Sequence, residues 1–106
     1  MSTELGISKR CIVRVILDES RVIKIIEKLP KWLRSGYSVW RRILLEEGFY
    51  GLRKIKGFHF EKLKGIRGGR YSCRLNRGYR VIFIQSEYKT ENKVIVIVME
   101  VSKHGY

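Results

Sequence analysis

The chain has 106 residues, of which 44% are hydrophobic, and its 23 Lys and Arg against 10 Asp and Glu give a net charge of +13. This length leaves room for one core, so we expect a single domain over residues 1–106, and the apolar content excludes a disordered tail. The charge predicts a polyanionic or acidic partner, with nucleic acid first, an acidic protein second and an anionic membrane surface third.

The sequence shows no sign of membrane insertion or export. No apolar run approaches the roughly 20 residues that cross a bilayer, and the N-terminal MSTELGISKR lacks the apolar segment of a secretory signal. The basic residues are spread along the chain rather than gathered on one amphipathic helix, which disfavours a membrane surface. We therefore expect a cytoplasmic protein with no membrane partner.

In chain order, residues 11–17 (CIVRVIL) are rich in β-branched residues and predict a first strand. Residues 18–20 then supply an N-cap and first-turn acids for a helix that carries Val22, Ile25, Ile26 and Leu29 at helical spacing. Pro30 either ends this helix or begins the next one.

A second helix is predicted over residues 30–47, followed by Gly48 just past its end. Both tryptophans, Trp32 and Trp40, are expected to pack in the core, because large aromatic residues at helical spacing usually face inward. The apolar stripe of this helix is Leu33, Tyr37, Trp40, Ile43 and Leu44.

Residues 48–69 are rich in glycine and basic residues and predict a loop or a short irregular strand. Three strands follow, over residues 70–75, 79–85 and 93–102. The last of them is almost continuously apolar, so it should lie mid-sheet with both faces covered. The order of elements predicts an α+β domain with helices packed on one face of a small sheet.

The two cysteines, Cys11 and Cys73, both fall in predicted strands. They are too few and too far apart in the sequence for a disulfide framework or a zinc site. We expect both to be small buried residues, and we expect neither a metal nor another cofactor.

The stretch between Gly68 and Ile84 reads as a hairpin in which Gly78 takes the left-handed position of a three-residue loop. This register places Arg74 directly opposite Arg80, with Leu75 opposite Tyr79. Like charges opposed on a strand pair destabilise it, so the arrangement favours use of both guanidinium groups on an anion such as phosphate. The alternative is a pair of solvated arginines, or pairing of one with a carboxylate such as Glu61 or Glu100.

The remaining predicted register of this hairpin places Cys73 opposite Val81 and Tyr71 opposite Phe83 on an apolar face. Its other face then carries Ser72 and Ile82 beside the two arginines. The whole interpretation depends on the turn, because a two-residue turn would shift the register and put the arginines on opposite faces.

The chain resembles the RelE/ParE superfamily of bacterial toxins from toxin–antitoxin pairs. The resemblance covers about residues 11–106 and rests on IIEKLP, FEKLKG, YSCRLNRGYRVIF and VIVIVMEVSKHGY. It implies a fold of one strand, two helices and a curved antiparallel sheet. It also implies a metal-independent endoribonuclease that cuts mRNA in the decoding site of the ribosome, with mRNA, ribosomal RNA and an acidic antitoxin as partners.

The resemblance also implies roles for individual residues. Arg80 would bind the transition-state phosphate together with Arg74, His104 would be the general acid, and Tyr106 would orient or stack on the substrate. Glu61 lies where one branch of the family keeps a general base. Residues expected to contact RNA are His59, Lys62, Lys64, Arg67, Arg70 and Ser72.

Several alternatives remain open from the sequence. Lys62, Lys64 and His59 are further candidates for the base, because other branches use lysine or histidine in this stretch. Ser72 replaces a lysine found in some ribosome-dependent members. Two other functions are possible on the same fold, a gyrase inhibitor of the ParE type and a basic RNA- or protein-binding domain without catalysis.

Overall fold

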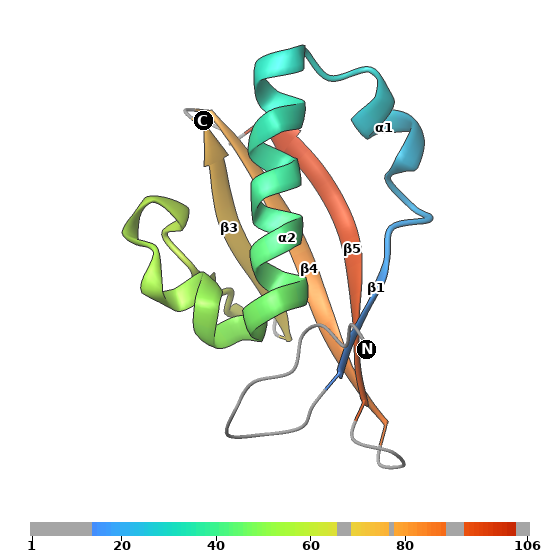
Figure 1. The fold of residues 1–106 in the computed structure, drawn as a ribbon, viewed down its shortest axis with the longest axis vertical. Coiled ribbons are helices and arrows are strands. Elements are labelled where there is room, and N and C mark those ends of the chain that lie inside the picture. Colours follow the sequence, from blue (N-terminus) through green and yellow to red (C-terminus); the bar gives the residue numbers. More distant parts are fainter. Residues whose placement is uncertain (1–13, 66–68, 77, 89–92, 104–106) are drawn as a thin grey trace.

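The computed structural model describes residues 14–65, 69–76, 78–88 and 93–103. They form an α+β fold in which helices lie on one face of a curved five-stranded sheet, as predicted (Figure 1). No helix in these ranges is both long and apolar enough to span a membrane. The strands, in their order across the sheet, are β1 (Arg14–Asp18), β5 (Lys93–Lys103), β4 (Tyr79–Tyr88), β3 (Arg70–Asn76) and β2 (Glu61–Lys62).

Strand β5 lies between β1, to which it is parallel, and β4, to which it is antiparallel. Its predicted position inside the sheet is therefore confirmed. Only one of its faces is fully covered, however, and this face carries Val96, Val98 and Val101. Ile95 and Ile97 on the other face are only half-buried, because the helices pack on one side of the sheet. The expectation that both faces would be covered was wrong.

Helix α1 (Ile23–Glu27) is shorter than the sequence predicted and has no side-chain cap. Asp18 caps the turn before the helix instead. Its Oδ1 accepts hydrogen bonds from the backbone N–H of Ser20 at 3.0 Å and from the Ser20 hydroxyl at 2.7 Å. These bonds lower the pKa of Asp18 and close a turn that competes with helix formation. The first buried residue after this turn is Val22, whereas Ile25 is exposed.

Helix α2 (Lys31–Lys54) buries one stripe of side chains against the sheet. Leu33, Tyr37, Trp40 and Leu44 follow one another at intervals of three or four residues, as an inward helix face requires. Trp40 is completely buried, as predicted, but Trp32 is 55% exposed. Trp32 precedes Leu33 by one position, and a rotation of about 100° per residue turns it away from the sheet.

Gly48 breaks α2 into two segments, which agrees with its predicted place after the helix. Its φ of 68° and ψ of −161° lie in a region that is essentially restricted to glycine. Beyond it the chain returns to helix up to Lys54, where we had predicted a loop. The break brings the Phe49 ring to within 5.6 Å of Phe83 and 5.1 Å of Tyr71, measured between ring centroids. A short 3-10 helix, η1 (Lys56–Phe58), leads on to β2.

Gly48→Ala is expected to destabilise the protein by about 1–3 kcal/mol, because a Cβ atom disfavours this backbone conformation whatever space surrounds it. The loss should be seen as a lower midpoint of urea unfolding. Gly57→Ala is a matched control, since Gly57 has open space for a Cβ and no positive φ. Equal stability of the two variants would show that the break tolerates a side chain.

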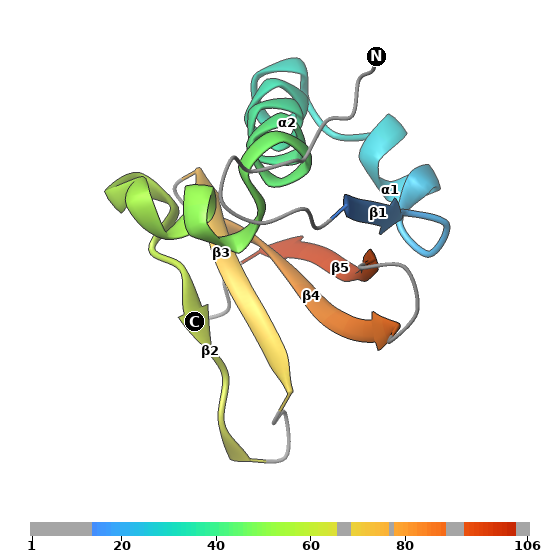
Figure 2. The same cartoon turned by 60° about the horizontal axis from the view of Figure 1, so that its bottom comes forward.

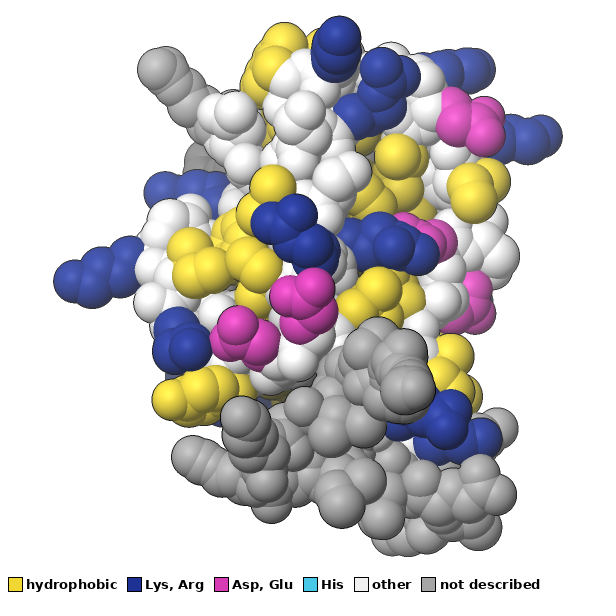
Figure 3. All heavy atoms as spheres, in the orientation of Figure 1, with side chains coloured by type: hydrophobic (Ala, Val, Ile, Leu, Met, Phe, Trp, Pro, Cys, Tyr) yellow, Lys and Arg dark blue, Asp and Glu magenta, His cyan; other side chains and the backbone are white. Residues whose placement is uncertain are grey.

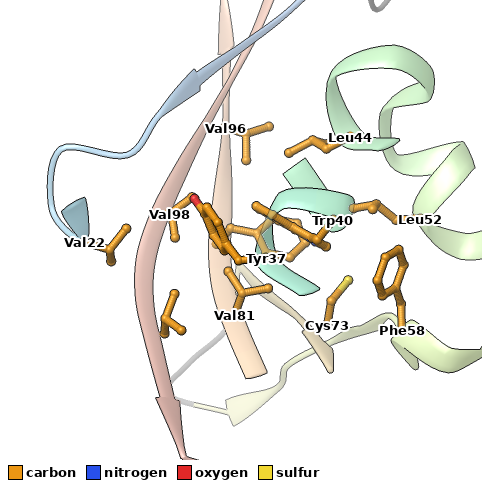
Figure 4. Packing of buried hydrophobic residues seen from close by; sticks show 12 residues of the cluster. Val22, Tyr37, Trp40, Leu44, Leu52, Phe58, Cys73, Val81, Val96 and Val98 are labelled. Atoms are coloured by element: carbon orange, nitrogen blue, oxygen red, sulfur yellow. The ribbon is translucent and has the colours of Figure 1, made fainter. Parts of the chain in front are cut away.

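The core lies between α2 and the sheet (Figure 4). At its centre the Trp40 ring lies 5.4 Å from that of Tyr37 and 5.3 Å from that of Phe83. Cys73 is a buried free thiol, as predicted, and burial raises its pKa to about 12. Cys11 lies outside the described residues.

At the edge of the core, Glu19 accepts hydrogen bonds from the Tyr37 hydroxyl at 2.6 Å and from Arg41 Nε at 3.0 Å. Burial and this carboxylate raise the pKa of Tyr37, so the phenol stays protonated and keeps donating. The segment before α1 is thereby fixed to α2. Glu19 is thus a tertiary anchor and not the first-turn helix acid that the sequence indicated.

Candidate functional site

The β3–β4 hairpin places Arg74 directly opposite Arg80, as the sequence predicted. The predicted pairs Cys73–Val81 and Tyr71–Phe83 are also present. The turn itself differs from the prediction. Tyr79 lies opposite Asn76 rather than Leu75, so the connection is shorter by one residue on the β3 side.

A β-bulge compensates for this shorter connection. The register shifts between Arg74 and Asn76, so that Leu75 has no partner on β4. One residue is lost from the loop and one is added in the bulge, and the arginines therefore remain on the same face. Gly78 has φ 83°, the left-handed conformation predicted for it.

The sheet face that carries the arginines is the one opposite to the helices (Figure 2), and we call it the open face. Its residues follow from strand alternation, because Cys73, Val81 and Phe83 point into the core beneath α2. One cross-strand row reads Glu61, Ser72, Ile82 and Glu100, of which Ser72 and Ile82 are buried, and the next reads Arg74, Arg80 and Ser102. Arg70 and Ile84 form a third row, which lies beyond the Glu61 row on the side away from the arginine pair.

No carboxylate in the described part of the chain lies within ion-pair distance of Arg74 or Arg80. Glu61 instead lies 3.6 Å from Nε2 of His59, and Oε2 of Glu100 accepts a hydrogen bond from the Ser102 hydroxyl at 3.3 Å. The alternative in which Glu61 or Glu100 neutralises one arginine is therefore not found. The opposed guanidinium groups keep their charge available for an external anion.

Arg80 differs from Arg74 in its surroundings. Arg74 is exposed, whereas Arg80 is half-buried, and its Nε–H is buried without a hydrogen-bond partner among the described residues. Such an unpartnered donor costs about 1–3 kcal/mol, and native proteins retain few of them. An acceptor for this N–H would have to lie below the exposed surface, beside the guanidinium group.

Strand β2 was not assigned from the sequence, although a short irregular strand was one reading of residues 48–69. It pairs Glu61 with Ser72 and thereby places this carboxylate on the open face. Lys62 pairs with Tyr71 and therefore points to the helix side of the sheet. Lys64 is exposed just beyond the strand. Three predicted site residues, Arg67, His104 and Tyr106, lie outside the described residues.

His59 immediately precedes this edge and has φ 45°, the one positive φ among described residues other than glycine. It is the C-cap of η1, where its N–H donates to Lys56 O at 3.0 Å. A left-handed cap lets the chain reverse from η1 into β2. The exposed imidazole is thereby held beside Glu61.

An open groove with a volume of about 680 Å³ lies beside β2. The sequence reading missed it, because its first wall belongs to the helical segment that follows Gly48. The spacing of Phe49, Leu52 and Arg53 was the available signal for that segment. The residues lining the groove are Arg53, Ile55, Lys56, His59, Phe60, Glu61, Lys62 and Tyr71.

The open face thus combines two cations on β3 and β4 with one carboxylate on β2. Glu61 and Arg80 are two strands apart, at about 4.8 Å per strand, and also two residues apart along the strands, so their backbone positions are about 12 Å apart. This separation allows the arginines to bind a phosphodiester while the carboxylate reaches a neighbouring hydroxyl group. Within the described ranges, no three His, Cys, Asp or Glu side chains are grouped as metal ligands would be.

Solved structures with the same fold include three toxins or toxin complexes. A YoeB/ParE toxin from Agrobacterium tumefaciens aligns with 12% identity and a TM-score of 0.56, over 88% of this chain and 100% of its own. The YoeB–YefM complex from Staphylococcus aureus gives 19% identity and a TM-score of 0.56, over 89% and 98% of the two chains. The chain has the fold of YoeB- and RelE-type toxins.

A further structure with this YoeB/RelE-type fold is the RelBE2 toxin–antitoxin complex from Mycobacterium tuberculosis, with 15% identity and a TM-score of 0.53 over 87% of this chain and 98% of that one. No protein-family model matches the sequence, and no curated protein matches it significantly. At these identities, the likeness concerns the YoeB/RelE-type fold and not the individual site residues.

Proposed function

We propose that this protein is the toxin of a toxin–antitoxin pair and that its open face cleaves RNA. The observation that carries the proposal is the opposed pair Arg74 and Arg80, which has no carboxylate partner in the described part of the chain and includes a buried, unsatisfied Nε–H. Like charges at this spacing are unfavourable unless an anion separates them. The YoeB/RelE-type fold supports the same function.

In the proposed reaction, Glu61 accepts the proton of a ribose 2′-hydroxyl, and the 2′-oxygen attacks the adjacent phosphorus. Arg80 and Arg74 stabilise the charge on the phosphorane. The bond from phosphorus to the 5′-oxygen breaks, and His104 donates a proton to that oxygen. The products are a 2′,3′-cyclic phosphate and a free 5′-hydroxyl, and these steps require no metal.

The proposed substrate is mRNA in the decoding site of the ribosome. Arg70 extends the open face beside the arginines, and Lys64 is exposed beyond β2. Arg67 is proposed to bind RNA with them, whereas Ser72 is only 4% exposed and is not proposed as an RNA contact. Such basic residues bind the RNA backbone without reading sequence, so the affinity should fall with salt. Tyr106 is proposed to orient the substrate.

The proposed protein partner is an acidic antitoxin in the cytoplasm. Two of the structures with the same fold are complexes with an antitoxin, YoeB–YefM and RelBE2. The net charge of +13 suits an acidic protein as well as RNA. On the helix-bearing side, lysine and arginine side chains lie across the visible surface, with acidic side chains interspersed among them (Figure 3).

The purified protein is expected to convert mRNA on translating ribosomes into fragments that end in a 2′,3′-cyclic phosphate, and to do so in the presence of EDTA. Mass spectrometry of the fragments identifies the terminus, and primer extension maps the cut. Intact mRNA at every protein concentration would contradict cleavage. Trapped DNA breaks with purified gyrase would instead favour a ParE-type inhibitor.

A further inference from the structure

The groove beside β2 lies on the helix side of the sheet and is separate from the arginine pair. We propose that it is a nucleotide subsite, which holds one base and the backbone of the RNA strand next to the bond that is cut. This inference rests on the proposed function, because the strand must already lie across the open face. Its support comes from the walls of the groove and from its position.

One wall of the groove is aromatic and already rigid. Tyr71 and Phe60 line it, with ring centroids 5.6 Å apart. Behind them, Phe83 is fully buried and stacks on Tyr71 at 5.8 Å with an interplanar angle of 23°. Phe49 contacts both wall residues edge-on, at 5.5 Å from Phe60 and 5.1 Å from Tyr71. These rings are already ordered in the folded protein, so stacking a base on them costs little further side-chain entropy.

The other walls are cationic. Arg53 lies over the Phe60 ring at 5.3 Å, and Lys56 and Lys62 line the same groove without an ion-pair partner among described residues. The single carboxylate is that of Glu61, which has His59 at 3.6 Å. Cations that alternate with aromatic faces suit single-stranded nucleic acid, because the cations bind phosphates and the rings stack on bases.

The position of the groove links it to the open face. Glu61 and Lys62 are consecutive residues of β2, and their side chains point to opposite sides of the sheet. β2 is an edge strand of only two residues, so an RNA strand can pass around it from the open face to the groove over a short distance. An RNA strand bound at Arg80 passes Glu61 and enters the groove at Lys62.

The test uses a short single-stranded oligonucleotide with 2′-O-methyl riboses, which cannot undergo 2′-hydroxyl attack. A 4-thiouridine is placed at each position in turn, and the cross-linked peptides of the full-length protein are identified after irradiation. We expect one position to cross-link to Tyr71 or Phe60. Cross-links that all fall elsewhere would overturn the subsite.

A binding measurement provides the second arm. An abasic site at the cross-linking position should weaken binding about 10-fold, whereas abasic sites at positions outside the footprint should have little effect. Replacing both Lys56 and Lys62 with alanine should reduce the slope of log affinity against log salt by about 1.4. The matched control replaces Lys24 and Lys31, two exposed lysines outside the groove, and should leave this slope unchanged. An equal reduction of the slope in both double variants would contradict the subsite.

The same reagents separate this inference from the proposed cleavage. Arg80→Ala should slow the cutting of ordinary RNA by about 100- to 1,000-fold but leave the cross-link at the groove. Cross-linking by a wild-type protein that never cuts RNA would remove the proposed reaction and keep the groove as an RNA site. RNA cutting by a protein that forms no cross-link in the groove would overturn the subsite and keep the proposed reaction. Displacement of the oligonucleotide by an acidic peptide, with no cross-link in the groove, would identify a protein-binding surface and overturn the subsite.

Discussion

Replacing Arg80 with alanine is expected to lower the rate of RNA cleavage by about 100- to 1,000-fold, the usual effect of removing one donor that stabilises charge in a transition state. The fold should be retained, because Arg80 makes no hydrogen bond through its buried Nε–H in the described structure. The alanine variant removes that unsatisfied donor, so its free energy of unfolding should not fall by more than about 1 kcal/mol. Single-turnover cleavage and urea unfolding measure the two effects separately.

Two further variants sharpen this prediction. Arg80→Lys keeps the charge but loses the planar fork, and it should recover only part of the activity. Arg42→Ala removes the same charge from an exposed position on α2 and should cleave RNA like the wild type. Equal activity of the Arg80 and Arg42 alanine variants would show that the hairpin arginine contributes only net charge.

Trp40→Ala is expected to destabilise the protein by about 3–5 kcal/mol, while Trp32→Ala should change stability by less than about 0.5 kcal/mol. Trp40 is completely buried between Tyr37 and Phe83, whereas Trp32 lies on the solvent side of the same helix. Because small domains have about 5–15 kcal/mol of stability, the first variant should lose a large part of it.

The two tryptophan variants form a matched pair, since they remove the same side chain from one helix. Chemical unfolding followed by circular dichroism gives both free energies. Similar losses would mean that Trp32 is covered by another part of the protein or by a second molecule. A stable Trp40 variant would contradict the packing of α2 on the sheet.

Patterns formed by residues close together in the sequence were sufficient to predict most of the fold. The alternation around Cys73 and the glycine at position 78 predicted the β3–β4 register, and the spacing of Leu33, Tyr37 and Trp40 predicted the buried stripe of α2. These signals are local, so the sequence alone contains them. The opposed arginines were predicted for the same reason.

Features that depend on tertiary contacts were not predictable in this way. The helical segment after Gly48 has only the spacing of Phe49, Leu52 and Arg53 as a local signal. It is stabilised by the packing of Phe49 on Phe60, Tyr71 and Phe83, which the sequence does not show. The two-residue strand β2 exists through its pairing with β3. Since the groove is built from these two elements, it could not be assigned before the structure. Glu61 was assigned a catalytic role only through a family resemblance, and its place opposite Ser72 comes from the pairing of β2 with β3.

The position of β5 determines when the sheet can be completed during synthesis of the chain. This strand pairs with β1, more than 70 residues earlier in the chain, and with β4, so the sheet cannot close until residues 93–103 are free to fold. Ser102 of this strand also completes the row that contains Arg74 and Arg80. A nascent chain that still lacks β5 has neither a closed sheet nor a complete arginine row. The proposed activity therefore cannot begin before this last described strand has emerged from the ribosome.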